Sequence, residues 1–498
     1  MSSLIKSGLI VSLFVLAGRL TGFGREWLLA FRGGASEHTD IAIVLLTFPD
    51  LVVNLLLGGG LTAALVPAYK RLGPGGDTAL LMQACRIIGG VFVLLALSVA
   101  ILALPTLSLL APGLSESTRD SFVWHFRLVT LSLPMAALSG AVVALLNSRE
   151  RFALGAAGTL IFNLSVIASL LVLPATETVT AIAAGALIGA GLRLATQTWG
   201  LRPVWTPPIG RHGLIDRTLV AQFLGSFSFL TVLVILPPLA RAFSSLDDAG
   251  SLSLFNYAYK LVELPMGVVI GSIVTVLLPR LAADLPQGSA AAGHASLATS
   301  LRFTLLFSLI IAIPSIFFAD VLVHIAFFSA NFRADQFDTL AALASIGFIA
   351  LPFQAMLNVY ASAFAASGHT RPLVVTAIVM LFSVAVLAPN LLAQIGLRGV
   401  MMSYGIAYLL GTILLTWHTA RHFGRATLRS ALHHAPTNIA LPAAAGLGVA
   451  CLGSTISVAT WSRLLWACLT VIVMLTLVIL SDQRLRTACM KRIKGHGR

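Results

Sequence analysis

The chain has 498 residues, of which 58% are hydrophobic and only 10% are charged. A soluble domain carries about 25% charged residues, so this composition excludes a soluble globular protein. The apolar runs are long and do not alternate in polarity, which excludes a transmembrane β-barrel and predicts membrane helices. The net charge of +14 does not indicate nucleic-acid binding, because the cations are spread over short loops between apolar runs.

The apolar segments predict an all-α integral membrane protein with about fourteen transmembrane helices. Lys6 precedes the first segment, as in a secretory signal, but Arg19 and Arg25 continue it and many spans follow, so we interpret it as a retained span. The expected cores are 5–31, 38–69, 80–111, 121–147, 153–174, 178–197, 217–243, 250–279, 296–325, 338–366, 373–395, 398–420, 434–456 and 461–481.

The first span contains two cations, Arg19 and Arg25. A charge at the centre of a membrane helix costs about 2.5–3.5 kcal/mol, so such residues usually face a bundle interior or a wet cavity. The two arginines lie about 120° apart on an ideal helix, and nearby glycines would allow the helix to bend. The alternative for Arg25 is that it extends to the outer surface beside Trp27.

The second span opens with Asp40, which is either a helix N-cap or a functional acid. Further along the span, Asp50, Asn54, Gly58 and Thr62 recur every four residues. This spacing places them on one helical face, and a polar face in a membrane helix indicates a cavity.

The eighth span has a similar polar face, formed by Asn256, Lys260, Glu263, Gly267 and Gly271. Two polar faces in different parts of the chain predict a central cavity that binds an anionic molecule. The alternative is a local Lys–Glu pair inside a packed bundle, because residues three apart on a helix can touch.

Cations gather at alternate loops, as Lys70, Arg149, Arg193 and Arg371 illustrate, whereas the intervening loops have few, such as Arg241. This is the positive-inside pattern, and it places both termini in the cytoplasm.

An internal repeat suggests how the spans are grouped. Residues 61–72 and 273–284 each end a span with a proline near a basic residue, and residues 147–152 resemble 367–372. The period of six spans predicts two parallel six-helix lobes and an extra C-terminal pair. The Pro-rich loop 198–216 is the expected junction. The expected domains are an N-lobe at 1–212, a C-lobe at 213–430, and spans 13–14 with a basic tail at 431–498.

The residues 18–69 resemble the opening of the MurJ (MviN) lipid II flippases of the MOP transporter superfamily, whose pattern begins S-R-x-x-G-x-x-R-[DE]. The eighth span resembles that family's Y-A-x-R-L-x-E-F-P-x-G pattern, and residues 145–152 with Asn163 resemble its fourth and fifth spans. The N-terminal positions that fit are Arg19, Gly22, Arg25, Glu26, Thr39, Asp40, Pro49, Gly59, Ala64, Val66 and Pro67.

The resemblance implies a bacterial inner-membrane flippase that moves an undecaprenyl-diphosphate-linked glycan, lipid II, by alternating access between its lobes. Spans 13 and 14 would form a groove for the isoprenoid tail. No covalent chemistry and no cofactor are expected, and an ion gradient or the membrane potential would supply the energy. The candidate substrate-binding residues are Arg19, Arg25, Lys260 and Asn54, and the candidate supporting or gating residues are Asp40, Asp50, Glu263 and Asn256.

The chain departs from the family pattern in its cations. Val53 and Asn54 occupy positions where the family usually has two arginines, Gly58 replaces a glutamate, and Lys260 replaces an arginine. Lysine lacks the bidentate fork that suits phosphate. An alternative is therefore a flippase for an exopolysaccharide unit or another lipid-linked oligosaccharide.

Three other classes fit the sequence less well. An ion-coupled exporter of organic cations predicts an acid-rich cavity, whereas here the cations equal or exceed the acids. A membrane glycan enzyme usually has a large catalytic outer loop, and no loop here is long enough. A scaffold that has lost transport remains an alternative because of the missing arginines. Possible protein partners are enzymes of cell-wall or polysaccharide synthesis.

Overall fold

The computed structural model describes residues 2–55, 61–208, 215, 217–267, 290–327, 331–432, 436–456 and 459–481. Within these ranges most residues are helical and no β-strand occurs, which confirms the all-α fold class. The expected repeat segment 273–284 lies outside the described residues, so the repeat stays a prediction.

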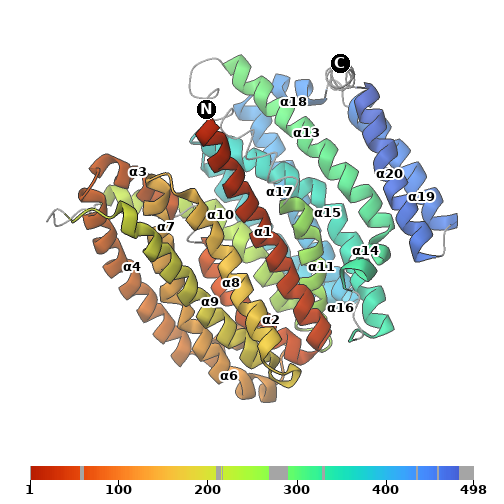
Figure 1. Cartoon of the computed structure of the whole chain (residues 1–498). Coiled ribbons are helices and arrows are strands. Elements are labelled where there is room, and N and C mark those ends of the chain that lie inside the picture. Colours follow the sequence, from red (N-terminus) through yellow and green to blue (C-terminus); the bar gives the residue numbers. More distant parts are fainter. Residues whose placement is uncertain are drawn as a thin grey trace, which may run out of the picture. The chain divides into compact units, whose positions relative to one another are not determined.

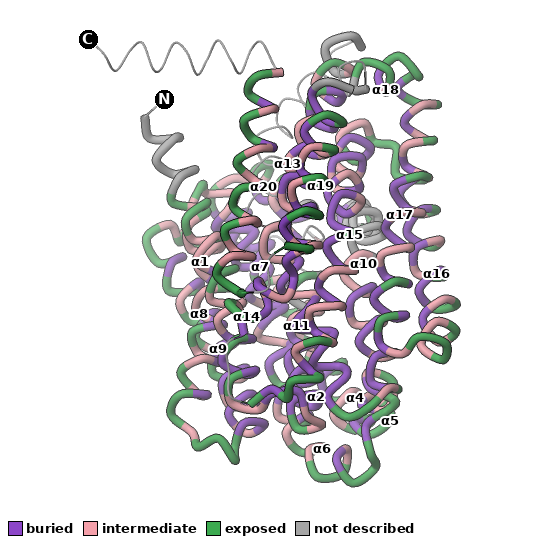
Figure 2. Tube along the Cα trace, turned by 90° about the vertical axis from the view of Figure 1, so that its right-hand side faces the viewer, coloured by how far each residue is buried: buried purple, intermediate pink, exposed green. Residues whose placement is uncertain are grey.

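Figure 1 shows the helices of the first half and labels all of them except α5, which is labelled in Figure 2. They are α1 (Ser2–Gly33), α2 (Glu37–Leu55), α3 (Leu61–Leu72), α4 (Gly76–Ile101), α5 (Ala103–Leu110), α6 (Glu116–Thr130), α7 (Ser132–Ser148), α8 (Phe152–Val172), α9 (Thr178–Leu201), α10 (Arg217–Ser244) and α11 (Ser251–Pro265), with short 3-10 helices at Ala175–Glu177 and Arg202–Val204.

The second half continues with further long helices and a short π-helix (Figure 1). They are α13 (Ala290–Phe317), α14 (Ala319–Ala326), α15 (Ala334–Ala366), α16 (Arg371–Ile395), α17 (Leu397–His422), α18 (Arg425–Leu432), the π-helix Pro436–Ala440, α19 (Leu441–Ile456) and α20 (Thr460–Ser481).

By packing, the chain divides into two compact units. Unit 1 comprises Met1–Tyr257 and Ser329–Phe332, and unit 2 comprises Ala258–Phe328 and Arg333–Arg498. The division falls inside α11, so the first part of this helix packs with unit 1 and its remainder with unit 2. The lobe boundaries at 212 and 430 stay a prediction.

Ten helical segments of the described residues are long and apolar enough to cross a membrane. They coincide with ten of the expected spans: Gly76–Ile101, Glu116–Ser148, Phe152–Val172, Ala175–Val204, His294–Phe317, Ala334–Ala366, Arg371–Ile395, Leu397–His422, Asn438–Ile456 and Thr460–Ser481. The other four expected spans correspond to α1, to α2 with α3, to α10 and to α11. The molecule is a multi-pass membrane protein.

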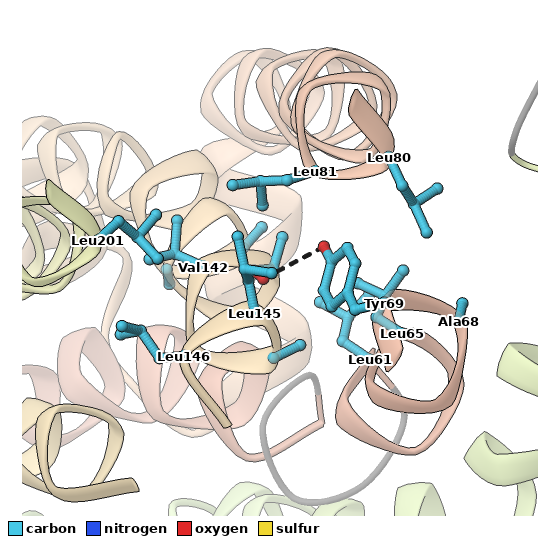
Figure 3. Packing of buried hydrophobic residues seen from close by; sticks show 14 of the residues in the cluster. Leu61, Leu65, Ala68, Tyr69, Leu80, Leu81, Val142, Leu145, Leu146 and Leu201 are labelled. Carbon is cyan, nitrogen blue, oxygen red and sulfur yellow. Dashed lines mark hydrogen bonds between the residues drawn. The ribbon is translucent and has the colours of Figure 1, made fainter. Parts of the chain in front are cut away.

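The core of unit 1 includes a cluster built from α3, α4, α7 and α9 (Figure 3). Tyr69 of α3 is buried among leucines, and its hydroxyl donates a hydrogen bond to the carbonyl of Ala141 at 3.5 Å. Leu80 and Leu145 close the cluster from α4 and α7. The hydrogen bond satisfies the phenol hydroxyl while the ring packs as an apolar group, so the cluster fixes α3 against α7.

Glycines allow α8 and α9 to pack closely within unit 1. A Cβ atom on Gly185 would lie 2.7 Å from the Cα of Val166, and one on Gly189 would lie 3.2 Å from the Cα of Phe162. Small residues at a helix interface let the backbones approach in a membrane. Side chains between these helices are therefore held within a narrow space.

In unit 2, α19 and α20 lie side by side and pack on α13 (Figure 1). Met474 and Val478 of α20 are buried against Leu306 and Ile310 of α13. The other face of α20 carries exposed apolar residues such as Leu465, and Figure 2 shows exposed and intermediate positions along this helix. An apolar face of this kind is suited to lipid contact.

Candidate functional site

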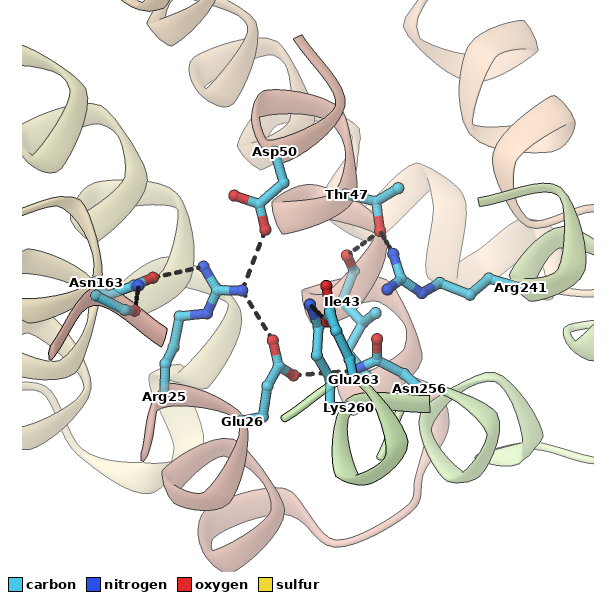
Figure 4. Close-up of polar contacts among 11 residues, drawn as sticks. Arg25, Glu26, Ile43, Thr47, Asp50, Asn163, Arg241, Asn256, Lys260 and Glu263 are labelled. Carbon is cyan, nitrogen blue, oxygen red and sulfur yellow. Dashed lines mark hydrogen bonds and ion pairs between the residues drawn. The ribbon is translucent and has the colours of Figure 1, made fainter. Parts of the chain in front are cut away.

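Arg25 of α1 lies at the centre of a buried polar network in unit 1 (Figure 4). Its side chain is only 3% exposed, and its Nη2 group is 2.8 Å from Glu26 Oε1 and 3.1 Å from Asp50 Oδ2. Its Nη1 group donates to Asn163 Oδ1 at 3.1 Å. Burying a charge is tolerated when it is paired and hydrogen-bonded, so Arg25 is compensated here without a ligand.

The network continues from Glu26 to α11. Asn256 donates its side-chain N–H to Glu26 Oε2 at 2.8 Å, and both residues are buried. The structure thus brings Arg25, Asp50 and Asn256 together through Glu26 in one hydrogen-bonded network, whereas a ligand cavity at these residues stays a prediction. The proposal that Arg25 extends to the outer surface is wrong, because the network holds its guanidinium inside the bundle.

The glycines of α1 allow this network to form by close packing with α8. Cβ atoms on Gly18 and Gly22 would lie 3.4 Å from Thr159 Cβ and 3.2 Å from Asn163 Nδ2. Asn163 also donates to the carbonyl of Gly18 at 3.0 Å. The helix α1 is continuous from Ser2 to Gly33, and these glycines allow its close approach to α8. The expected bend of α1 stays a prediction.

Arg19 differs from Arg25, although both lie on α1. Its side chain is exposed, and it makes no hydrogen bond or ion pair with any residue that the structure describes. Asn54 of α2 is likewise exposed and has no such contact within the described ranges. Both side chains are therefore available to a ligand.

Asp40 lies on α2, but its side chain caps the start of a different helix, α11. Its carboxylate accepts hydrogen bonds from the backbone N–H of Gly250 at 2.8 Å and of Ser253 at 2.7 Å, and from the Ser253 hydroxyl. These groups lie at the start of α11, where unpaired N–H groups and the helix dipole favour an acid. The capping alternative made Asp40 the N-cap of its own span, and it is wrong, because α2 begins at Glu37 and the Asp40 carboxylate instead caps α11.

Gly250 is required at this junction. Its φ of +90° lies in a region that L side chains rarely adopt, and a Cβ atom there would lie 2.6 Å from the backbone of Ala35. The hydroxyl of Tyr257 adds a bond to the carbonyl of Gly34 at 3.3 Å. The loop between α1 and α2 and the start of α11 therefore form one hydrogen-bonded junction within unit 1.

Two arginines that the charge pattern assigned to loops are buried in helices of unit 1. Arg241 lies on α10, is 9% exposed and donates to Thr47 Oγ1 at 3.1 Å (Figure 4). Arg193 lies on α9 and is 2% exposed. The assignment failed because both residues lie near the ends of apolar segments, where sequence does not distinguish a loop cation from one turned into the bundle.

In unit 2, Lys260 and Glu263 form a local ion pair. Lys260 Nζ lies 2.7 Å from Glu263 Oε2, with side-chain exposures of 23% and 42%. The local-pair alternative is thus supported for these two residues, while a role in ligand binding stays a prediction. The described residues contain no group of three or more His, Cys, Asp or Glu side chains that could hold a metal ion.

Sequence reasoning missed Glu26 and Asn163 of the buried network as site candidates, and it also missed the buried Arg241 on α10. Glu26 and Asn163 were noted only as positions that fit the family pattern. An acid directly after an arginine inside an apolar span was a signal for Glu26, because two opposite charges there suggest mutual compensation.

Membrane helices grouped in two compact units, with a buried charged network in unit 1, are typical of polytopic membrane transporters. The fold matches that class. A solved structure titled as an inward-facing multidrug resistance MATE family transporter of the MOP superfamily has a TM-score of 0.66 at 12% identity, covering 85% of this chain and 99% of that chain.

Closer similarity is found to one family within that superfamily. A solved structure of lipid II flippase MurJ in an inward closed conformation has a TM-score of 0.83 at 18% identity, covering 95% of this chain and 98% of that one. The lipid II flippase MurJ of Burkholderia cenocepacia is 28% identical over 437 residues, which cover 83% of each chain. The family model described as lipid II flippase MurJ matches residues 31–472. The chain belongs to the lipid II flippase MurJ family.

Proposed function

We propose that this protein moves lipid II from the cytoplasmic to the outer leaflet of the bacterial inner membrane by alternating access, without covalent chemistry. The observation that carries the proposal is the match of the MurJ family model over residues 31–472. The similarity in fold over 95% of the chain supports it. The exopolysaccharide alternative is not favoured by these comparisons.

The cargo of this proposal carries a diphosphate, which needs accessible cations. Arg19 is the first candidate, because its side chain is exposed and has no partner among the described residues. Lys260 is the second, because its ion pair with Glu263 is local and partly solvated. Charge-assisted hydrogen bonds to phosphate are among the strong ones. Arg25 would act indirectly in this conformation, since two carboxylates already occupy its guanidinium.

The isoprenoid tail needs an apolar surface. The exposed face of α20 offers Leu465, Leu469 and Ile472, and the neighbouring α19 offers Leu447 and Leu452. The helix pair packs on α13 and leaves these faces uncovered by the described part of unit 2. We propose that the tail follows this pair while the head group crosses the membrane.

The orientation follows from the loop charges, which place both termini in the cytoplasm. The membrane potential can contribute energy where charge moves across the bilayer, at about 2.3 kcal/mol per elementary charge per 100 mV. A transport cycle in which the unoccupied, positively charged binding site returns toward the cytoplasm would draw on this energy of the membrane potential.

The test is functional replacement in a bacterium whose own lipid II flippase can be depleted. Expression of this chain is expected to restore growth and the outer-leaflet accessibility of lipid II in spheroplasts. A matched strain expressing Arg19→Gln at the same membrane abundance serves as the control. Normal insertion of the wild-type chain without any recovery of lipid II accessibility would contradict the proposal, and transport of a lipid-linked exopolysaccharide unit instead would favour the alternative.

A further inference from the structure

Arg193 is a buried cation that has no partner of opposite charge in contact with it among the residues that the structure describes. It lies on α9 of unit 1 and is 2% exposed. Its Nε and Nη2 groups are buried and have no hydrogen-bond partner among the described residues. An arginine side chain is always protonated in proteins and has only donors to offer. These donors therefore need an acceptor that the described side chains do not provide.

Gln197 lies one helical turn after Arg193 and adds a third donor. Its side-chain oxygen accepts a hydrogen bond from the hydroxyl of Ser139 on α7. That bond fixes the orientation of the amide, and its Nε2 group is buried without a partner within the described ranges. Residues four apart on a helix share a face. The unpartnered N–H groups of Arg193 and Gln197 thus belong to one face of α9.

The geometry around Gly158 of α8 shows that these donors converge. A Cβ atom on Gly158 would lie 2.6 Å from Gln197 Nε2 and 2.9 Å from Arg193 Nε. Because both nitrogens lie so close to the same point, they are at most about 5.5 Å apart. One acceptor at hydrogen-bond distance from both can bridge such a pair.

The charge balance favours an anion over a water molecule as that acceptor. Arg25 contacts two carboxylates, Glu26 and Asp50. No carboxylate lies within ion-pair distance of Arg193 among the described residues, and Asp50 acts on it only at longer range. A buried charge without a partner is costly. A water molecule could accept these hydrogen bonds but would leave the charge uncompensated.

We propose that Arg193 and Gln197 form a binding site for a small monovalent anion, such as chloride, between α8 and α9 of unit 1. The anion accepts hydrogen bonds from Arg193 Nε and Gln197 Nε2 and neutralises the guanidinium. Because Gly158 has no side chain, the two donor nitrogens can occupy the space where a Cβ atom would otherwise clash with them. This site is separate from the Arg25 network, and it does not depend on the identity of the transported molecule.

The site is tested first by thermal unfolding of the purified full-length protein in detergent. Chloride is titrated against gluconate at constant ionic strength. The wild-type protein is expected to show a saturable rise in unfolding midpoint with chloride, because a ligand that binds only the folded state stabilises it. Arg193→Gln and Gln197→Leu are expected to lose this rise. Arg241→Gln is the matched control, since Arg241 is also a buried arginine of unit 1, and its chloride response is expected to persist.

Two further measurements keep the proposal testable if Arg193→Gln does not fold. Gly158→Ala retains the arginine but adds a Cβ atom that displaces both nitrogens, so it is expected to lose the chloride response. Crystals grown with bromide are expected to show anomalous scattering next to Arg193. The proposal is overturned if the wild-type protein shows no chloride response, or if the response persists in Gly158→Ala and Gln197→Leu. A response abolished only by Arg19→Gln would also overturn it, because the anion would then bind elsewhere.

Discussion

Arg25 of unit 1 and Lys260 of unit 2 look alike in the sequence, since each is a cation with a glutamate nearby inside an apolar segment. Their surroundings differ. Arg25 is 3% exposed and contacts side chains from α1, α2 and α8, whereas Lys260 is 23% exposed and contacts an acid three residues further along its own helix. A buried cation with distant partners stabilises packing, while a partly exposed one with a local partner can exchange that partner for a ligand.

The largest effect is expected for Arg25→Gln, which tests whether the buried network of Arg25 stabilises the fold. The variant leaves Glu26 and Asp50 without their cation, and removing one partner of a buried ion pair costs about 3–5 kcal/mol. We expect a large fall in the thermal unfolding midpoint and in the amount of folded protein, measured on detergent-purified samples. Combining Arg25→Gln with Glu26→Gln and Asp50→Asn is expected to recover part of that loss. An unchanged midpoint in Arg25→Gln would show that the network is not structural.

The second change tests the junction that ties α11 to unit 1. Asp40→Ala removes the acceptor of three hydrogen bonds, including two from backbone N–H groups at the start of α11. A loss of about 1.5–3 kcal/mol is expected, as for hydrogen bonds to a charged group. Asp40→Asn keeps an acceptor oxygen and should lose less. Equal midpoints for wild type and Asp40→Ala in thermal unfolding would rule out the cap.

The third change concerns Lys260 and is expected to affect transport rather than stability. A partly solvated i,i+3 pair contributes only about 0.3–0.5 kcal/mol, so Lys260→Ala should unfold near the wild-type midpoint. Loss of a cation that contacts phosphate should lower lipid II accessibility in spheroplasts by about tenfold. Lys260→Arg is the matched control and should retain activity. Destabilisation of Lys260→Ala on the scale of Arg25→Gln would contradict the comparison.

The smallest expected effect concerns Glu37, at the start of α2. Partial burial would raise the pKa of this carboxyl, but hydrogen bonds from Ser115 and Thr118 outweigh it and lower the pKa overall. A lowered pKa in the folded state means that the stabilisation is present above the ordinary glutamate pKa of about 4.5 and is lost as pH falls through the folded pKa. Below about pH 4.5 the midpoint of wild type should therefore fall slightly more than that of Glu37→Gln. Parallel pH profiles would show that the Ser115 contact contributes nothing.

The features that sequence predicted are those that depend on local order. The ten apolar helices were expected from their length, and the Lys260–Glu263 pair from a spacing of three residues. Two of the three partners of Arg25 lie 25 and 138 residues away, and Asp40 caps a helix more than 200 residues further on. Such contacts depend on which helices pack together, and a single sequence does not specify that. The burial of Arg193 was missed for the same reason.

Arg19 is exposed and has no partner among the described residues, whereas Arg25 links three helices of unit 1. One experiment can compare the two residues for both stability and transport. Arg19→Gln and Arg25→Gln would be compared for thermal unfolding and for lipid II accessibility in flippase-depleted spheroplasts at equal membrane abundance. We expect Arg19→Gln to unfold like wild type yet to lose about tenfold or more of the lipid II accessibility, whereas Arg25→Gln is expected to lose stability. Wild-type accessibility in Arg19→Gln, or an unfolding midpoint as low as that of Arg25→Gln, would contradict this expectation.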